Sequence, residues 1–157
     1  MQKTIRFSLS TLLCLSLLFV SGCGGDPKTA MTEATKQLLT AIVEAEKATD
    51  HPNGILGFPK ETIQKVATTF KTKANAINFG GCPDDFKDAA SAVRQAYITM
   101  FDTEAEHYDS ILADPDAAET KFGSIGQAVF TAMDRFKEVC EKHGVDLQQI
   151  GKEMSKP

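Results

Sequence analysis

Apolar side chains recur every three or four residues in four long stretches of this chain. In the first stretch the apolar positions are Met31, Ala34, Leu38, Ala41, Ile42, Ala45 and Ala48. Charged and amide side chains fill the positions between them, so one side of an α-helix would be apolar and the other polar. The pattern predicts a helix that starts at Asp26-Pro27 or Thr29 and ends near Asp50.

Each of the other three stretches is bounded by residues that begin or end helices. Pro59 precedes the second stretch, and Gly80-Gly81 follow it. Pro83 opens the third, Asp114-Pro115 opens the fourth, and Gly144 ends the fourth. Proline favours the first helical turn and glycine the position just after a helix, so these residues predict three further helices.

The apolar stripes of these helices predict the core of the domain. They are Ile63, Val66, Ala67, Phe70, Ala74 and Ile77; then Phe86, Ala90, Val93, Tyr97, Met100 or Phe101, Tyr108 and Leu112; then Phe122, Ile125, Val129, Met133, Phe136, Cys140 and His143. Four amphipathic helices with short connections are typical of an all-α domain, an antiparallel up-down four-helix bundle. Asp146 predicts the start of a short fifth helix through Leu147 and Ile150. The bundle domain is expected over residues 29–157.

A different apolar run, residues 7–20, precedes the helices and follows two basic residues, Lys3 and Arg6. A short basic segment followed by an apolar segment of this length is typical of a secretory signal peptide. A membrane-spanning helix needs about 20 apolar residues, which is more than this run offers. Residues 1–22 are therefore expected to be a signal peptide.

The signal segment ends in Val20-Ser21-Gly22-Cys23, which resembles the lipobox of bacterial lipoproteins. The resemblance implies that Cys23 becomes the mature N-terminus and carries diacylglyceryl on its sulfur, with a further acyl chain, such as palmitate, on its amino group. Several acyl chains together anchor a protein stably to a membrane. Residues 23–28 would then be a lipidated tether. In many Gram-negative lipoproteins, an aspartate directly after the lipidated cysteine retains the protein in the inner membrane. Here Gly24 occupies that position, so the resemblance favours the outer membrane, and the domain is expected to face the periplasm.

The charge of the chain after residue 22 excludes some partners. The first 22 residues hold two of the 17 basic residues and none of the 21 acidic ones, so fifteen bases face 21 acids in the remainder. An acidic domain argues against nucleic acid and against a basic patch for anionic lipid. The 135 residues that follow residue 22 are long enough for one domain with a sizeable core.

Cys82 and Cys140 are the two cysteines left in the domain, since Cys14 lies in the signal segment and Cys23 carries lipid. In an exported protein such a pair is most simply a disulfide, and two buried free thiols are the alternative. Cys82 lies 31 residues before Ala113 and Cys140 lies 27 after it. In an antiparallel helix pair their heights would differ by roughly 6 Å, which a tilt can absorb.

Met31 and His143 raise the possibility of a cofactor. They lie near the start of the first helix and the end of the last long one, a layout similar to that of the cytochrome b562 family of periplasmic haem bundles. That resemblance implies Met31 and His143 as axial haem ligands, and it supports an alternative function as a haem- or metal-binding bundle in electron transfer.

Other candidate chemistry is incomplete. Di-iron bundles need two Glu-x-x-His motifs, and the chain has one, Glu104-x-x-His107. Seven acids occur between Asp102 and Lys121, which suits a basic partner or a weakly bound cation as well as helix capping and solubility. No EF-hand, nucleophile elbow or phosphate-binding loop is present.

We therefore expect no metal, no cofactor and no enzymatic activity. We expect instead a non-catalytic module that binds an envelope component or a protein, with residues 54–58 as a candidate contact.

Overall fold

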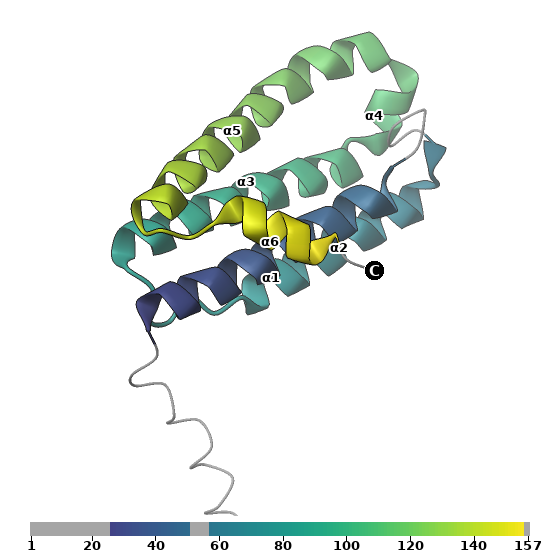
Figure 1. The fold of residues 1–157 in the computed structure, drawn as a ribbon. Helices are drawn as coiled ribbons and strands as arrows, with labels where there is room; N and C mark the ends of the chain where they lie inside the picture. Colours follow the sequence, from purple (N-terminus) through teal and green to yellow (C-terminus); the bar gives the residue numbers. More distant parts are fainter. Residues whose placement is uncertain (1–25, 51–56, 156–157) are drawn as a thin grey trace, which may run out of the picture.

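The computed structural model describes residues 26–50 and 57–155, with only the helical backbone for residues 115–121, and it confirms the all-α prediction over these ranges. The elements are α1 (Pro27–Ala48), α2 (Lys60–Ala76), α3 (Asp84–Glu106), α4 (Tyr108–Ala113), α5 (Pro115–Lys142) and α6 (Leu147–Met154) (Figure 1). Within these ranges no helix combines the length and the hydropathy needed to cross a bilayer. The predicted signal peptide, Cys23 and most of the segment 54–58 lie outside the described residues.

The central element is α3, which packs against α2, α5 and α1. Two of its aromatic contacts show the two halves of the core. Phe86 meets Phe136 of α5 with ring centroids 5.5 Å apart, and Phe101 meets Phe70 of α2 at 5.0 Å. Phe70, Phe86 and Phe136 are all fully buried, so they join three of the four long helices through one continuous core.

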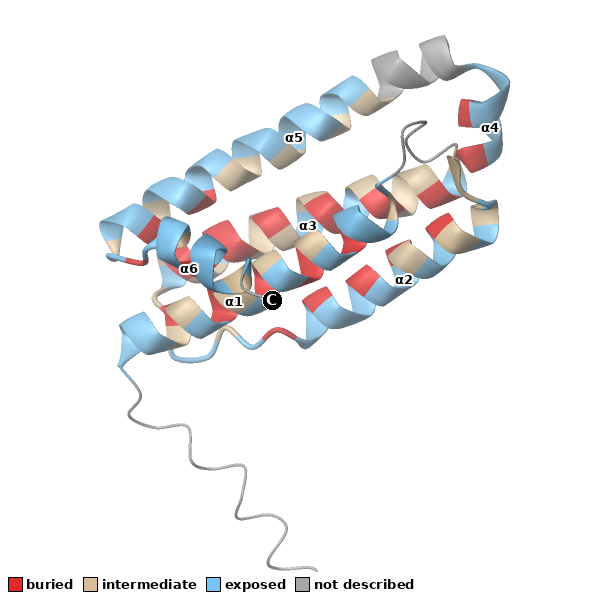
Figure 2. Cartoon of the chain, turned by 45° about the vertical axis from the view of Figure 1, so that its right-hand side comes forward, coloured by how far each residue is buried: buried red, intermediate tan, exposed pale blue. Residues whose placement is uncertain are grey.

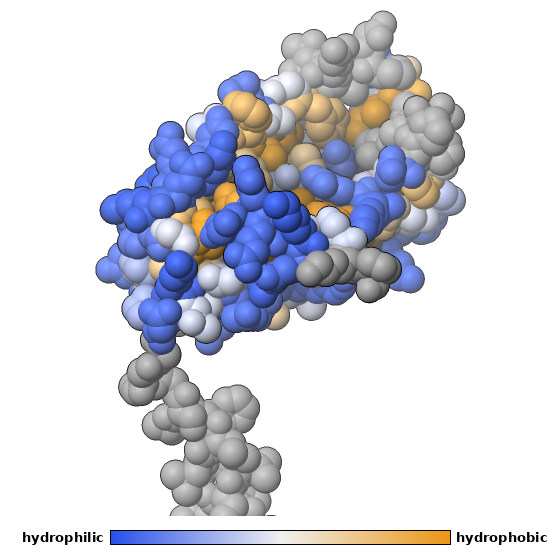
Figure 3. Space-filling model, in the orientation of Figure 1, coloured by the Kyte–Doolittle hydropathy of each residue, from blue (hydrophilic) through white to orange (hydrophobic). Residues whose placement is uncertain are grey.

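One side of the molecule is less closed than the predicted bundle. α1 packs mainly on α2, with smaller contacts to α3 and α6, while α5 packs mainly on α3. Figure 2 shows α5 largely exposed along its length, and Figure 3 shows apolar surface in the hollow between α5 and the α1–α6 side. Of the apolar stripe predicted for α5, only Phe136 and Cys140 are buried, whereas Val129 and Met133 are partly buried and Phe130 beside them is 61% exposed.

The helix ends largely agree with the sequence. The Asp26 carboxylate accepts a hydrogen bond from the Lys28 N–H at 3.4 Å, and the Asp146 carboxylate accepts one from the Gln149 N–H at 2.9 Å. Gly144 ends α5 with φ +69°, and the next N–H, of Val145, donates to the Cys140 carbonyl at 2.8 Å. This is the hydrogen bond of a Schellman turn, which needs a residue that tolerates positive φ.

The third predicted helix is broken, which corrects one core assignment. α3 ends at Glu106 and α4 begins at Tyr108, and Leu112, predicted to be in the core, is 58% exposed. Ile111 is buried instead, at 7%. The Tyr108 hydroxyl donates a hydrogen bond to the Phe58 carbonyl at 2.6 Å, so the break lets α4 turn onto the segment that leads into α2.

One other boundary differs from the prediction. α2 ends at Ala76, four residues before the glycine pair, although Ile77 remains buried in the loop that follows. The predicted short C-terminal helix is present as α6, and it buries Ile150 against the core. Lys36 of α1 forms an ion pair of 2.8 Å with Glu153 of α6, which joins the last helix to the first.

Candidate functional site

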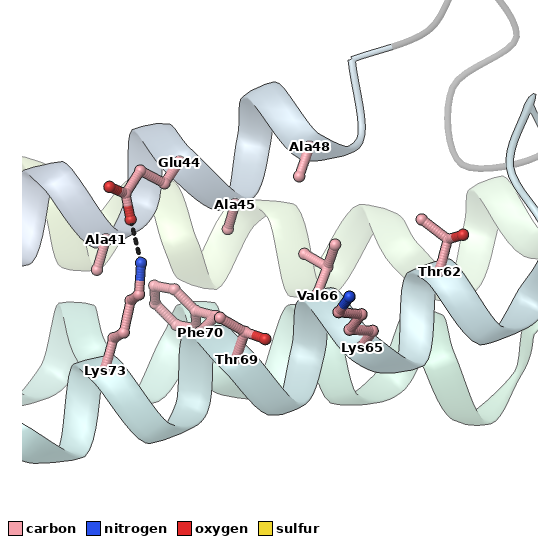
Figure 4. Close-up of a pocket in the computed structure, with 10 residues that line it drawn as sticks. All are labelled: Ala41, Glu44, Ala45, Ala48, Thr62, Lys65, Val66, Thr69, Phe70 and Lys73. Carbon is pink, nitrogen blue, oxygen red and sulfur yellow. Dashed lines mark hydrogen bonds and ion pairs between the residues drawn. The ribbon is translucent and has the colours of Figure 1, made fainter.

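A groove of about 410 Å³ lies between α1 and α2 (Figure 4). Its volume is within the usual range for small-molecule sites, roughly 300–1,000 Å³. It is lined by Ala41, Glu44, Ala45, Ala48, Thr62, Lys65, Val66, Thr69, Phe70 and Lys73. We refer to it as the α1–α2 groove.

The floor of the α1–α2 groove is apolar. Ala41 and Ala45 of α1 are 5% and 6% exposed, and they face Val66 and Phe70 of α2 in Figure 4. Alanine side chains on α1 end at Cβ, so they do not fill the space above the Phe70 ring. Ala48, predicted to be a core residue, is exposed at the mouth of the groove.

The rim of the groove is polar and carries three charges. The Glu44 carboxylate and the Lys73 ammonium form an ion pair of 2.5 Å across one end (Figure 4). Both side chains are about half exposed, so the pair contributes at most about 1 kcal/mol and can separate at little cost. Among the described residues, Lys65 has no such partner.

A second cavity adjoins the end of α1 and contains the most perturbed carboxyl of the molecule. Val43, Met100, Phe101 and Glu104 are among its lining residues, and burial raises the pKa of Glu104 from the ordinary 4.5 to about 7. Nearby, burial also raises the pKa of Tyr97 to about 12, and its hydroxyl lies 3.3 Å from Glu46 Oε1, to which it donates a hydrogen bond. No group of three metal-ligating side chains occurs in the part of the chain that the structure describes.

The structure has Cys82 and Cys140 as free thiols, so the predicted disulfide between them is not present in it. Both thiols are buried. Burial raises the pKa of Cys82, and it raises the pKa of Cys140 to about 11. The second possibility left by the sequence, two buried thiols, therefore describes this structure. A disulfide needs both a short distance between the two Cα atoms and side chains that point at each other, and spacing along the chain does not determine the second condition.

Among the residues whose burial is described, Thr35 is the one buried polar side chain, and it interacts with Cys140. Its hydroxyl lowers the Cys140 pKa, although by less than burial raises it. Within the described ranges Thr35 Oγ1 makes no hydrogen bond of normal geometry, so its contact with the thiol is a weak one.

The structure places Met31 in the core and His143 beside Asp85. Met31 is 2% exposed in the core, and neither residue lines the α1–α2 groove or the cavity at Glu104. Nε2 of His143, the atom that would bind iron in the expected layout, lies 3.0 Å from the Asp85 carboxylate. Both ligands would have to leave their present contacts before a haem could be bound.

The acidic stretch after Asp102 is partly neutralised by lysines of α2. Lys71 pairs with Asp102 at 2.7 Å, and Lys60 pairs with Asp109. Asp116 and Glu119 belong to the residues whose side chains are not described. These contacts favour a structural role for the acids, namely to join α2 to α3 and α4.

Searches of protein-family models, curated proteins and solved structures found no match to this chain. The residues of the α1–α2 groove lie on two helices that the sequence predicts, but the sequence pattern does not predict the groove. The signal for it is the spacing of Ala41, Ala45 and Ala48, three small residues on one side of α1.

Proposed function

We propose that this chain is a non-catalytic binding module that lipid on Cys23 tethers to the cell envelope of a bacterium. In this proposal the domain faces the periplasm, with the outer membrane favoured, and the α1–α2 groove receives the apolar part of an envelope ligand or protein. The observation that carries the binding role is the groove itself, which has a buried apolar floor and a polar rim.

The position of the groove suits a tethered protein. α1 begins at Pro27, only a few residues after Cys23, so the start of this helix would lie close to the membrane. Ala41 and Ala48 are 14 and 21 residues further along α1, or roughly 20–30 Å at the helical rise. The groove would therefore open away from the bilayer surface, where it is accessible to molecules in the periplasm.

We also propose that α1, α2, α3 and α5 act together as an antiparallel up-down four-helix bundle. Successive long helices pack on each other, and short connections join them. α6 would complete the less closed side by packing on α1.

The tether is tested by fractionation of cells that produce the full chain. Cys23→Ser should move the protein out of the membrane fraction or leave its signal uncleaved, while Cys14→Ser should leave it membrane-bound. If the Cys23→Ser protein is processed and still sediments with membranes, the anchor is wrong.

The groove is tested by the binding of a neutral apolar fluorophore, N-phenylnaphthylamine, to the mature chain with Ser at position 23. Ala48→Leu places a larger side chain at the mouth and should abolish most of the fluorescence gain. Ala76→Leu changes an equally exposed alanine at the end of α2, away from the groove, and should have no effect. Equal binding by both variants would contradict the proposed site.

A further inference from the structure

We propose that the ligand of the α1–α2 groove is a single-chain amphiphile with an anionic head group, and that Lys65 binds this head group. The inference rests on the binding role proposed above and adds the chemical class of the ligand. Three features of the groove support this inference: the shape of its floor, the balance of charge at its rim, and two hydroxyl groups that have no hydrogen-bond partner among the described residues.

The floor has room for one alkyl chain. It runs between Ala41 and Ala48, about 10 Å along α1, as one strip between two helices. Its walls are the Cβ atoms of alanine, the Val66 side chain and the Phe70 ring. Removing an alkyl chain from water onto such a surface is favourable and makes no demand for hydrogen bonds.

The rim has one charge that is not compensated. Glu44 and Lys73 neutralise each other across the groove, while Lys65 has no ion pair among the described residues. A site with a net single positive charge beside an apolar strip favours an anion over a neutral or cationic head group. The alkyl stem of a lysine can lie along apolar surface while its ammonium group stays in water, so Lys65 suits this boundary.

Two threonines continue the polar side of the groove along α2. Thr62, Lys65 and Thr69 are three and four residues apart, which places them on one side of the helix. Elsewhere along α2, the Thr68 and Thr72 hydroxyls donate to backbone carbonyls four residues earlier, each at 2.9 Å. Within the described part of the chain, the Thr62 and Thr69 hydroxyls have no hydrogen-bond partner and can donate to a head-group oxygen.

The test compares three ligands of equal chain length as competitors of N-phenylnaphthylamine, each below its micellar concentration. The mature chain with Ser at position 23 should bind dodecanoate most tightly, dodecanol about fivefold more weakly, and dodecyltrimethylammonium least tightly. Lys65→Gln should reduce dodecanoate affinity about fivefold, to the level of dodecanol, and leave dodecanol affinity unchanged. Lys71→Gln is the matched control, because Lys71 is also an exposed lysine of α2 but pairs with Asp102 of α3.

The outcomes separate this inference from the function on which it rests. If dodecanoate and dodecanol compete equally well, and Lys65→Gln changes neither, the anionic ligand class is wrong while the apolar groove stands. If none of the three competes, or Ala48→Leu has no effect on any of them, both proposals fail. If Lys71→Gln weakens dodecanoate as much as Lys65→Gln does, the preference reflects the overall charge of α2 and the role of Lys65 is wrong.

Discussion

His143 Nε2 lies 3.0 Å from both carboxylate oxygens of Asp85, so the last residues of α5 are joined to the first turn of α3. Lys142 donates to the same carboxylate at 2.7 Å. The two partners, Lys142 foremost, lower the Asp85 pKa from the ordinary 3.8 to about 2. Asp85 directly precedes Phe86, whose buried ring packs on that of Phe136 of α5.

Asp85→Asn should lower the melting temperature by a few degrees at neutral pH. The folded-state pKa is below the unfolded one, so the ionised carboxylate stabilises the fold above about pH 4, and this contribution is lost as pH falls toward 2. Thermal unfolding of wild type and variant should therefore converge near pH 2. Asp88→Asn, an exposed change one turn along α3, is the control, and equal effects of the two variants would contradict the role of Asp85.

Glu104→Gln should stabilise the domain at pH 8 by about 1–2 kcal/mol in the free energy of unfolding. The folded-state pKa, about 7, is above the ordinary 4.5, so wild type loses stability as pH rises between these values and the carboxylate ionises in its buried site. Glutamine stays neutral and avoids that loss. Urea unfolding at pH 5 and pH 8 measures the difference in the free energy of unfolding between wild type and variant. Glu106→Gln, a change at an exposed position, is the control. A gain that is the same at both pH values would show that ionisation of Glu104 is not its cause.

The two thiols should be protected in the folded domain and free in the unfolded one. The mature chain with Ser at position 23, prepared without reductant, should react hardly at all with a thiol reagent at pH 8, because Cys82 and Cys140 are buried and burial raises both pKa values. In denaturant, two thiols per chain should react. No reaction in denaturant would mean that the cysteines are paired as a disulfide, contrary to the structure.

Ile111→Ala should destabilise the domain by about 2 kcal/mol or more, since it removes a buried side chain and leaves a cavity. Leu112→Ala should change stability by no more than about 0.5 kcal/mol, because Leu112 is 58% exposed. Chemical denaturation of the two variants compares neighbouring positions directly. The reverse order would mean that α3 continues unbroken through His107.

Thr35→Val should stabilise the domain by about 1 kcal/mol, because the Thr35 hydroxyl is fully buried without a hydrogen bond of normal geometry among the described residues. Valine has nearly the same shape and no polar atom to desolvate. The free energy of unfolding of the variant, measured beside that of Thr35→Ser, provides the test. A loss of stability in Thr35→Val would show that the hydroxyl makes a hydrogen bond that stabilises the fold by more than its desolvation destabilises it.

Most helix positions and several helix ends could be predicted from the sequence because they depend on neighbours in the chain. The spacing of Met31, Leu38 and Ile42 repeats the period of an α-helix, and all three are buried as predicted. Gly144 ends α5 and Asp146 caps α6, since positive φ and a capping carboxylate are properties of single residues.

Contacts between helices were decided only by the tertiary structure. The spacing of Cys82 and Cys140 along the chain was compatible with a disulfide, but the structure has both as free thiols, because a disulfide also depends on side-chain directions that periodicity does not contain. Just after the break that follows Glu106, the Tyr108 hydroxyl donates a hydrogen bond to the Phe58 carbonyl, and those residues are 50 positions apart. The α1–α2 groove exists because Ala41, Ala45 and Phe70 meet at a helix interface whose spacing depends on both helices together. A sequence pattern describes one helix at a time, so the residues that face the core were predictable and the surface where a ligand could bind was not.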